Sequence, residues 1–343
     1  MDVALLWPRR WSAGIAFTVC FGALVYWPGA GRAAGDRAEV LFPGGRAYPE
    51  SITATADGTL FAGSIAEGGV FRVRPGSDTA ERWIQPGAAG TMSTLGVLAD
   101  ERSGTLWVCS SDASGVGVPP PDGVKPVALF AFDLGTGATK GSYRLPGDKT
   151  FCNDAVVDAD GTVYVTDSLQ PRVLRLRPGA SAFEVWAENP AFGNGAILDG
   201  IAIASDGNVY VNTFGNGRLF RIAMGQDGTA GQTAELRTSV PLDHPDGMRS
   251  YGRGALLLAE GGGRFSIAHL EGGDRARIEA VAEGYKGPVS MVQAGTVAWL
   301  LEGQQNTLFD PAKAGKPGPF RAYAVPLPLP PGVDASGAPA PPR

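Results

Sequence analysis

Four polar residues occupy the same position in a repeated stretch of the sequence, and their side chains together could hold a cation. Each stands eight residues before a turn glycine, and the four are Glu50, Asn153, Asp199 and Asp246. Oxygen ligands without Cys or His suit a hard cation such as Ca²⁺ or Mg²⁺. Converging carboxylates repel one another and raise their own pKa values unless a cation neutralises them. The pattern therefore predicts a cation site to which Asp246 contributes.

Local turn roles are the alternative for most of these residues. Asp246 lies in "HPDGM", where Pro-Asp-Gly favours a turn by itself, and Asp199 in "LDGIAI" shares that alternative. Asn153 could be a local cap, and we expect Asp154 beside it to be structural. Glu50 has the strongest case as a ligand, because glutamate has little use in turns.

Short antiparallel strands are predicted to position these residues. The chain of 343 residues contains 50 Gly and 27 Pro, which is too many helix breakers for a helical protein. Only 18% of its residues are charged. Six segments, among them "PESITATADGTLFAGSI" and "CNDAVVDADGTVYVTDS", each match a strand, a Gly turn and a second strand. They recur at roughly 40 to 57 residues, which is the spacing of propeller blades.

The repeat predicts an all-β, six-bladed β-propeller over residues 38–328. A β-sandwich, the alternative, would have no fixed repeat. The stretches "AEVLFPGG" near the start and "FRAYAVPL" near the end are spare strands that could complete the ring by joining the first and last blades.

The innermost strand of each blade should run from the polar position to the turn glycine, so these positions would form a ring around the axis. We call this ring the column. Its other two members are Gly96, or Leu95 if the second copy has one extra residue, and Gly287. None of these supplies a ligand. The prediction is a central metal site on the face opposite the Gly turns.

With its repeat and the stretches "PESI", "CNDAVVDADGTVYVTD" and "PDGMRS", the chain resembles the senescence marker protein / gluconolactonase / luciferin-regenerating-enzyme family over roughly residues 40–325. The resemblance implies a divalent metal at the top of the central channel, held by Glu50, Asp199 and Asp246. Asp199 replaces the usual Asn. Ca²⁺ is the first expectation, with Mg²⁺, Mn²⁺ or Zn²⁺ as alternatives. Asn153 matches a substrate-contacting Asn, and Phe151 stands where that family has an Arg.

The chemistry that the resemblance implies is hydrolysis of a lactone or related ester. The cation would polarise the carbonyl, while Asp246 takes a proton from the attacking water and Asn153 orients the substrate. Phe151 and His244 are further candidates for substrate contact, although an exposed rim residue is the favoured interpretation of His244 and a catalytic base is the other. The alternative function is a non-catalytic propeller that binds a peptide, sugar or protein across its top.

Further residues are expected on the same face. Glu260 and Glu302 follow the second strands of blades five and six and should reach it, unless they are solvated loop charges. The loops "DASGVGVPPPDGVK" (112–125) and "NPAFGNGAI" (189–197) could serve as lids or specificity walls, with plain linkers as the equal alternative.

Residues 1–34 resemble a signal peptide: Arg9 and Arg10 precede an apolar stretch and then small residues. A retained membrane anchor is the alternative. We expect a periplasmic or secreted monomer without stable membrane association after cleavage, and a disordered Pro-rich tail over 329–343.

Charge and cysteine content complete the expectations. The formal net charge of -5 and the lack of a Lys/Arg-rich run give no basis for nucleic-acid binding. With Cys20 in the signal, Cys109 and Cys152 remain. Export would allow them to pair, but we expect two buried, unpaired side chains, because the sequence cannot fix their separation.

Overall fold

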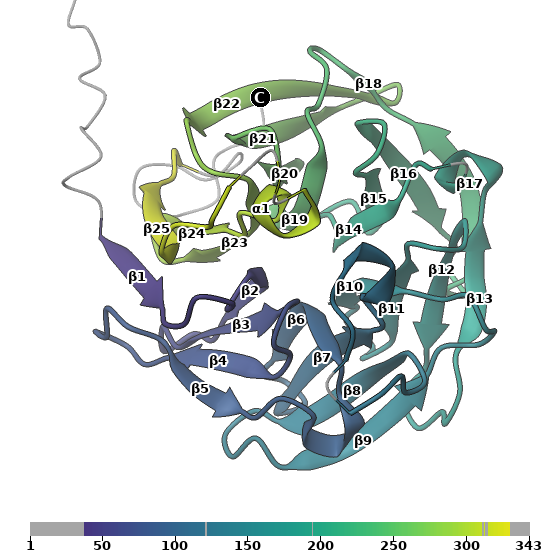
Figure 1. The fold of residues 1–343 in the computed structure, drawn as a ribbon. Coiled ribbons are helices and arrows are strands. Elements are labelled where there is room, and N and C mark those ends of the chain that lie inside the picture. The colour runs from purple at the N-terminus through teal and green to yellow at the C-terminus, as the bar shows by residue number, and fades with distance from the viewer. Residues whose placement is uncertain (1–37, 121, 194, 311, 313–314, 330–343) are drawn as a thin grey trace, which may run out of the picture. The chain divides into compact units, whose positions relative to one another are not determined.

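The computed structural model describes residues 38–329 except 121, 194, 311, 313 and 314. Six antiparallel sheets surround a central axis, as Figure 1 shows, and each sheet begins with its innermost strand. The predicted all-β, six-bladed propeller is confirmed.

Blades one to three each contain four strands in chain order from the axis outward. Blade one comprises β2 (Pro49–Ala54), β3 (Leu60–Ser64), β4 (Val70–Val73) and β5 (Glu81–Ile84). Blade two comprises β6 (Ser93–Asp100), β7 (Thr105–Ser111), β8 (Ala128–Asp133) and β9 (Thr139–Arg144). Blade three comprises β10 (Cys152–Val157), β11 (Val163–Asp167), β12 (Arg172–Leu176) and β13 (Glu184–Glu188).

Blades four and five repeat this order, and blade six closes the ring. Blade four comprises β14 (Leu198–Ile203), β15 (Val209–Thr213), β16 (Arg218–Met224) and β17 (Ala230–Glu235). Blade five comprises β19 (Pro245–Tyr251), β20 (Ala255–Glu260), β21 (Arg264–Glu271) and β22 (Arg275–Glu283), with β18 (Arg237–Thr238) added parallel to β22. Blade six comprises β23 (Pro288–Ala294), β24 (Val297–Glu302), β25 (Phe320–Pro326) and β1 (Glu39–Phe42). The described residues include four short helical turns in loops: η1 (Ala88–Gly90), η2 (Ser114–Val116), η3 (Pro190–Phe192) and α1 (Asn306–Phe309).

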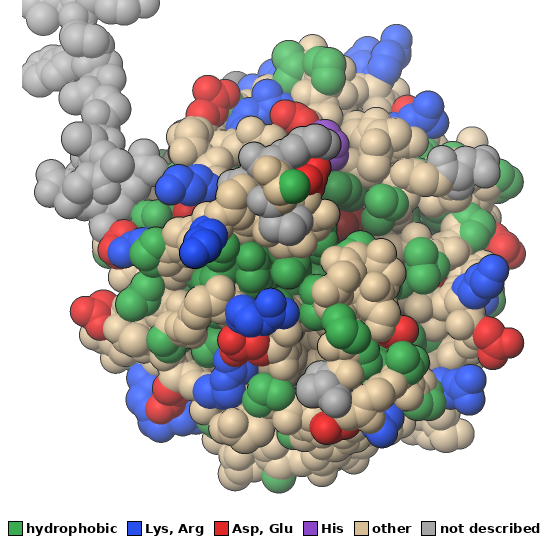
Figure 2. All heavy atoms as spheres, in the orientation of Figure 1, with side chains coloured by type: hydrophobic (Ala, Val, Ile, Leu, Met, Phe, Trp, Pro, Cys, Tyr) green, Lys and Arg blue, Asp and Glu red, His purple; other side chains and the backbone are tan. Residues whose placement is uncertain are grey.

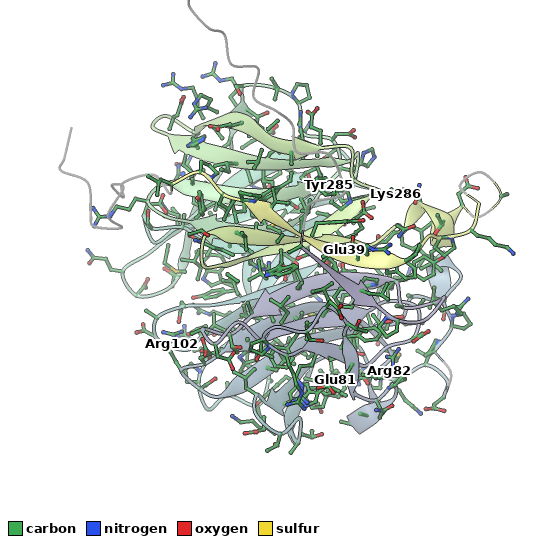
Figure 3. All side chains as sticks on the ribbon, turned by 90° about the vertical axis from the view of Figure 1, so that its left-hand side faces the viewer. Glu39, Glu81, Arg82, Arg102, Tyr285 and Lys286 are labelled. Carbon is green, nitrogen blue, oxygen red and sulfur yellow. A yellow bond between two sulfur atoms is a disulfide. The ribbon has the colours of Figure 1, made fainter. Side chains whose placement is uncertain are left out.

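The two ends of the propeller meet in blade six. Strand β1 pairs with β25, so that Glu39 lies opposite Tyr323 and Phe42 opposite Phe320. This confirms the expectation that the first and last spare strands complete the ring. In the side view of Figure 3, Glu39 lies at this seam. Arg102, in the hairpin turn of blade two, lies at the opposite edge of that view from Lys286.

Apolar side chains between neighbouring blades form the core. Tyr164 and Trp186 of blade three, for example, pack with Ile201 and Phe220 of blade four. The innermost strands are buried along most of their length; β2 and β14 each have five buried residues followed by one partly buried residue. Burial of this kind fixes the register of each strand, because a slip by one residue would turn its apolar side chains away from the core.

Cys109 on β7 and Cys152 on β10 are fully buried and form a disulfide, with their Cα atoms 5.2 Å apart. The expectation of buried side chains is confirmed, but the expectation that they stay unpaired is wrong. The reason is the contact between the second strand of blade two and the innermost strand of blade three, which places both cysteines in one apolar cluster. The sequence reveals the blades but not which of their residues meet.

The predicted signal peptide, residues 1–34, lies outside the described residues, and so does the predicted tail over 329–343 apart from Leu329. Within the described part of the chain, no helix has the length and apolar character that a membrane crossing requires.

Candidate functional site

The four predicted polar residues meet at one end of the central channel. In four blades the first residue of the innermost strand pairs with the end of the second strand, and the register then shifts. The residue that follows lies in this irregularity and faces the channel, and these residues are Glu50, Asn153, Asp199 and Asp246. A bulge is a device for redirecting a side chain, and here it directs one from each blade toward the axis.

In blades two and six, the column residue does not stand eight residues before the turn glycine. In blade two the shift follows Thr94, so the position belongs to Leu95, the alternative considered, and not to Gly96. In blade six the shift follows Pro288, so Val289 occupies the position and the prediction of Gly287 is wrong. The physical reason is a shorter hairpin: Ala294 pairs with Val297, which leaves only a two-residue turn.

The Gly that follows each aspartate explains why Asp-Gly occurs here without a turn. A Cβ on Gly200 would lie 2.5 Å from the backbone oxygen of Asp246, and a Cβ on Gly247 would lie 2.8 Å from that of Val289. Innermost strands of neighbouring blades thus approach so closely that only glycine fits. Asp199 and Asp246 lie in strands β14 and β19, so the turn alternative is wrong for both.

Side chains from the second strands fasten the column between blades. Thr166 Oγ1 on β11 donates to the backbone oxygen of Asp199 at 2.7 Å, and Asn212 Nδ2 on β15 donates to that of Asp246 at 2.7 Å. Asn153 Nδ2 donates to Ser168 Oγ at 2.9 Å. Sequence analysis did not single out Thr166, Asn212 or Ser168. Their signal is a polar residue near the end of an otherwise apolar second strand or, for Ser168, directly after it.

The column carboxylates are buried, and burial changes their acidity. Glu50, Asp199 and Asp246 are only 5%, 6% and 4% exposed. Loss of hydration raises the pKa of Asp199 to about 8, with repulsion by Asp154 as the next cause. Burial, followed by repulsion from Asp199, raises the pKa values of Glu50 and Asp246 well above their usual range. Burial and mutual repulsion thus disfavour the charged form of all three groups unless a cation compensates their charge.

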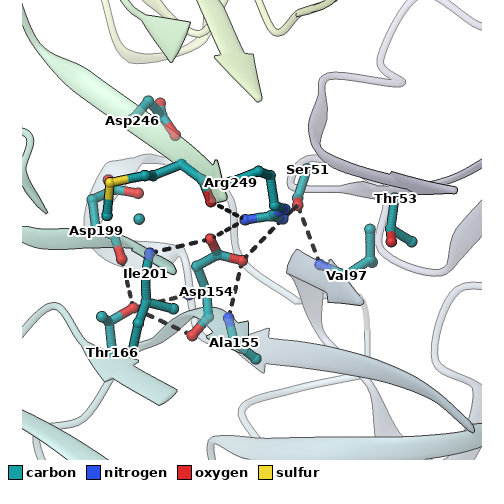
Figure 4. Close-up of polar contacts among 12 residues, drawn as sticks. Ser51, Thr53, Val97, Asp154, Ala155, Thr166, Asp199, Ile201, Asp246 and Arg249 are labelled. Atoms are coloured by element: carbon teal, nitrogen blue, oxygen red, sulfur yellow. Dashed lines mark hydrogen bonds and ion pairs between the residues drawn. The ribbon is translucent and has the colours of Figure 1, made fainter. Parts of the chain in front are cut away.

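Asp154 lies deeper in the channel and has a cation of its own. Arg249 Nη1 on β19 donates to Asp154 Oδ2 at 2.6 Å, as Figure 4 shows, and the Asp154 backbone N–H donates to Thr166 Oγ1 at 3.1 Å. Ser51 Oγ lies 3.4 Å from Arg249 Nη2. The structural role expected for Asp154 agrees with this geometry. Arg249 was missed, although an arginine inside a buried innermost strand indicates an internal ion pair.

No metal centre is formed by the side chains as they stand: the described residues contain no group of three or more His, Cys, Asp or Glu that could hold an ion. The donor chemistry nevertheless fits a hard cation. Glu50 Oε2 is buried and has no hydrogen-bond partner. A buried carboxylate oxygen without a partner is costly, and a cation would satisfy it.

A cavity of about 220 Å³ opens above the column. Glu50, Asn153, Asp199 and Asp246 all line it, and so does Phe151, which is partly buried just before β10. The structure therefore brings together all of the predicted metal and substrate residues except His244, which borders a neighbouring cavity that shares Asp246.

His244 lies at the rim. Its side chain is 55% exposed, its Nδ1 lies 2.7 Å from Asp243 Oδ1, and its ring packs against Phe214 with centroids 5.1 Å apart. This is the exposed rim position that the sequence allowed.

Glu260 and Glu302 end β20 and β24 on the column side, but they line neither cavity and they are not solvated. Glu260 is fully buried and accepts from Arg264 Nη2 at 2.6 Å and from the Asp243 backbone N–H at 2.8 Å. Glu302 accepts from the Lys286 backbone N–H at 2.7 Å, and burial raises its pKa. Each holds the chain that enters the innermost strand of its own blade, β19 for Glu260 and β23 for Glu302.

The two long loops supply walls. Val116, in the loop over 112–125, and Ile197, at the end of 189–197, both line the cavity above the column. Each loop thus contributes one described residue to the wall of the cavity, and a role as lid or specificity wall stays a prediction.

No protein-family model and no curated protein sequence matches the chain. Solved structures with the same fold include a gluconolactonase from Xanthomonas campestris, 18% identical with a TM-score of 0.60 over 84% of this chain and 88% of that one. A luciferin-regenerating enzyme is 14% identical, with a TM-score of 0.60 over 81% and 91%. Virginiamycin B lyase from Staphylococcus aureus is 16% identical, with a TM-score of 0.56 over 76% and 80%. The similarity of these proteins to this chain is one of fold.

Proposed function

We propose that this chain is an exported, metal-dependent hydrolase that opens a lactone or cleaves a related ester. One observation carries the proposal: Glu50, Asp199 and Asp246 surround one small channel space, and none of the three forms an ion pair with any described residue. Three carboxylates cannot all ionise in such a space without a cation. The shared fold with a gluconolactonase supports the reaction class.

Glu50, Asp199 and Asp246 would hold the cation, for which Ca²⁺ is the first candidate and Mg²⁺, Mn²⁺ and Zn²⁺ are alternatives. When bound, it would polarise the carbonyl of the substrate. Asp246 accepts a proton from water, whose oxygen bonds to the carbonyl carbon. The C–O bond of the ester then breaks, and the leaving oxygen takes the proton from Asp246. The products are a hydroxy acid from a lactone, or an acid and an alcohol from an ester.

The other site residues orient the substrate. Asn153 donates one amide hydrogen to Ser168 Oγ, which fixes the amide plane beside the column. Phe151 provides an apolar surface at the position where the resembled family has an arginine. His244 contributes at the rim. We further propose that the chain acts as a monomer on a small molecule, in the periplasm or after secretion. The buried disulfide supports this location, because disulfides persist in oxidising compartments.

The test begins with purified protein from which metal has been removed by a chelator. Lactones and aryl esters are then screened with Ca²⁺, Mg²⁺, Mn²⁺ or Zn²⁺ added singly, and metal binding is measured by calorimetric titration with Ca²⁺ and Mn²⁺. We expect one saturable binding event that Glu50→Gln abolishes. Glu188→Gln, at the exposed end of the outer strand β13, is the matched control and should bind as wild type does.

Two outcomes would contradict the proposal. Absence of binding by either metal would remove the cation from the mechanism. Binding without hydrolysis of any lactone or ester would favour a non-catalytic propeller that binds its ligand across the same face.

A further inference from the structure

The wall of the cavity above the column is apolar. Its floor is polar, but the surrounding surface is formed by Val116, Phe151, Leu169, Ile197, Phe214 and Phe309. These side chains come from loops of blades two, three and four and from α1, which Figure 1 shows near the centre of the ring. Of the described residues that line this cavity, none is Lys, Arg or His.

The wall gathers exposed hydrophobic side chains from distant parts of the chain. Val116, Leu169, Ile197 and Phe309 are 42%, 63%, 41% and 43% exposed, and all four line this one cavity. Single exposed apolar residues are ordinary, whereas a cluster at the mouth of a pocket marks a binding surface. Figure 2 shows hydrophobic side chains gathered around the centre of this face.

Ile197 has a strained backbone, as do Tyr48 and His244 at the same position of their blades. Its φ is 57°, in the left-handed region that β-branched residues rarely adopt. Such a conformation costs about 1 to 3 kcal/mol. Ile197 is 41% exposed, so burial of its side chain does not offset that cost. It lies two residues before Asp199, where the strain holds an apolar side chain at the edge of the reactive site.

Polyhydroxylated substrates find few partners in this wall. Besides the column, the polar residues that line the cavity are Ser168 and Gln305. Ser168 Oγ already donates to the Leu198 backbone oxygen at 2.6 Å and accepts from Asn153. Each sugar hydroxyl buried without a partner would cost about 1 to 3 kcal/mol, whereas each buried CH₂ group would gain about 0.8 kcal/mol.

We propose that the site takes an uncharged lactone or ester that carries an alkyl or aryl group, which binds against this apolar wall, and that it discriminates against sugar lactones. This inference rests on the proposed hydrolase function. The carbonyl lies over Glu50, Asp199 and Asp246 while the apolar group contacts Phe151, Leu169 and Ile197.

The experiment compares three lactones with the metal-loaded protein: δ-valerolactone, δ-decanolactone with its pentyl side chain, and glucono-δ-lactone. We expect kcat/KM for δ-decanolactone to exceed that for δ-valerolactone by at least about tenfold, given the gain for each buried CH₂. Glucono-δ-lactone should be the poorest substrate. Leu169→Ser should lower the ratio of the first two values severalfold. Leu329→Ser, 60% exposed and outside the cavity, is the matched control and should keep the ratio.

The outcomes separate this inference from the proposed function. Hydrolysis with equal rates for the two simple lactones, or with glucono-δ-lactone preferred, would overturn the apolar specificity and leave the hydrolase intact. An unchanged ratio in Leu169→Ser would remove the wall from recognition. Absence of turnover on every lactone and aryl ester would overturn the proposed function and this inference with it.

Discussion

Two sets of buried carboxylates lie in the propeller and differ in how their charge is balanced. Asp167 and Glu260 end second strands; each is fully buried, and each has an arginine partner, Arg172 at 3.0 Å and Arg264 at 2.6 Å. The column acids Glu50, Asp199 and Asp246 begin innermost strands and have no ion-pair partner among the described residues. The charges of the first set are balanced within the protein, without a ligand.

The difference teaches where to look for chemistry in a repeated fold. A buried acid with an internal arginine and backbone N–H donors is a structural device, because its charge and hydrogen bonds are satisfied. A group of buried acids without such partners requires protons or an external cation. Asp154 marks the boundary: it lies in the channel, yet Arg249 pairs with it. Asp154 therefore belongs with the arginine-paired acids, although it lies beside the column.

The largest effect is expected from removing the cation of a structural acid. Arg264→Met leaves Glu260 buried with a charge that only Ser266 and the Asp243 backbone N–H contact. Breaking a buried pair in this way typically costs about 3 to 5 kcal/mol, so the free energy of unfolding in urea should fall by that amount.

The control for this variant is Arg253→Met, at an exposed hairpin turn, which should change stability by less than about 0.5 kcal/mol. Adding Glu260→Gln to Arg264→Met should recover part of the loss, because it removes the orphaned charge. Equal stability of Arg264→Met and wild type would show that the pair is not structural.

Asp246→Asn tests the other set. The change keeps side-chain size, so the fold should survive with its melting temperature nearly unchanged. It removes the proton acceptor for water and one charge from the column, so kcat should fall at least about a hundredfold, which corresponds to about 2.7 kcal/mol. Turnover is measured on the best substrate of the lactone and ester screen.

Asp160→Asn, in the exposed hairpin turn of blade three, is the matched control and should have nearly wild-type turnover. Comparable hydrolysis by Asp246→Asn and wild type would make Asp246 a structural residue and favour the binding propeller.

Most of the fold was predictable because it depends on local patterns that repeat. The Gly turns, the period-two strands and the spare terminal strands each have a signature in the sequence. The column was predictable for four blades because the column residue lies at the same distance from the turn glycine in each. Three of their hairpins have five-residue connections, and in blade five a longer strand, β19, makes up for a shorter connection. Blade six failed because its turn has two residues, which moved the position from Gly287 to Val289.

What the sequence could not supply depends on contacts between blades. The Cys109–Cys152 disulfide, the Arg249–Asp154 pair and the fastening of Asp199 by Thr166 each join residues of different blades. No local pattern encodes those distances. The apolar character of the wall was hidden for the same reason, because Val116, Leu169 and Phe309 come from three loops far apart in the chain.

The pH dependence of stability should separate the two sets most finely. A carboxyl whose pKa is raised in the folded protein binds its proton more tightly when folded than when unfolded, so it stabilises the fold below its unfolded pKa near 4. That contribution is lost as the pH rises through the folded pKa, which for Asp199 is about 8. The melting temperature of chelated protein should therefore fall between pH 5 and 8.5, by about 5 °C or more.

Glu50→Gln should flatten this fall in melting temperature, since it removes one of the repelling groups, and saturating Ca²⁺ or Mn²⁺ should flatten it as well. Glu188→Gln should reproduce the wild-type slope. A melting temperature that stays constant or rises over this range in chelated wild-type protein would mean that the column acids are balanced within the chain, as Asp167 and Glu260 are.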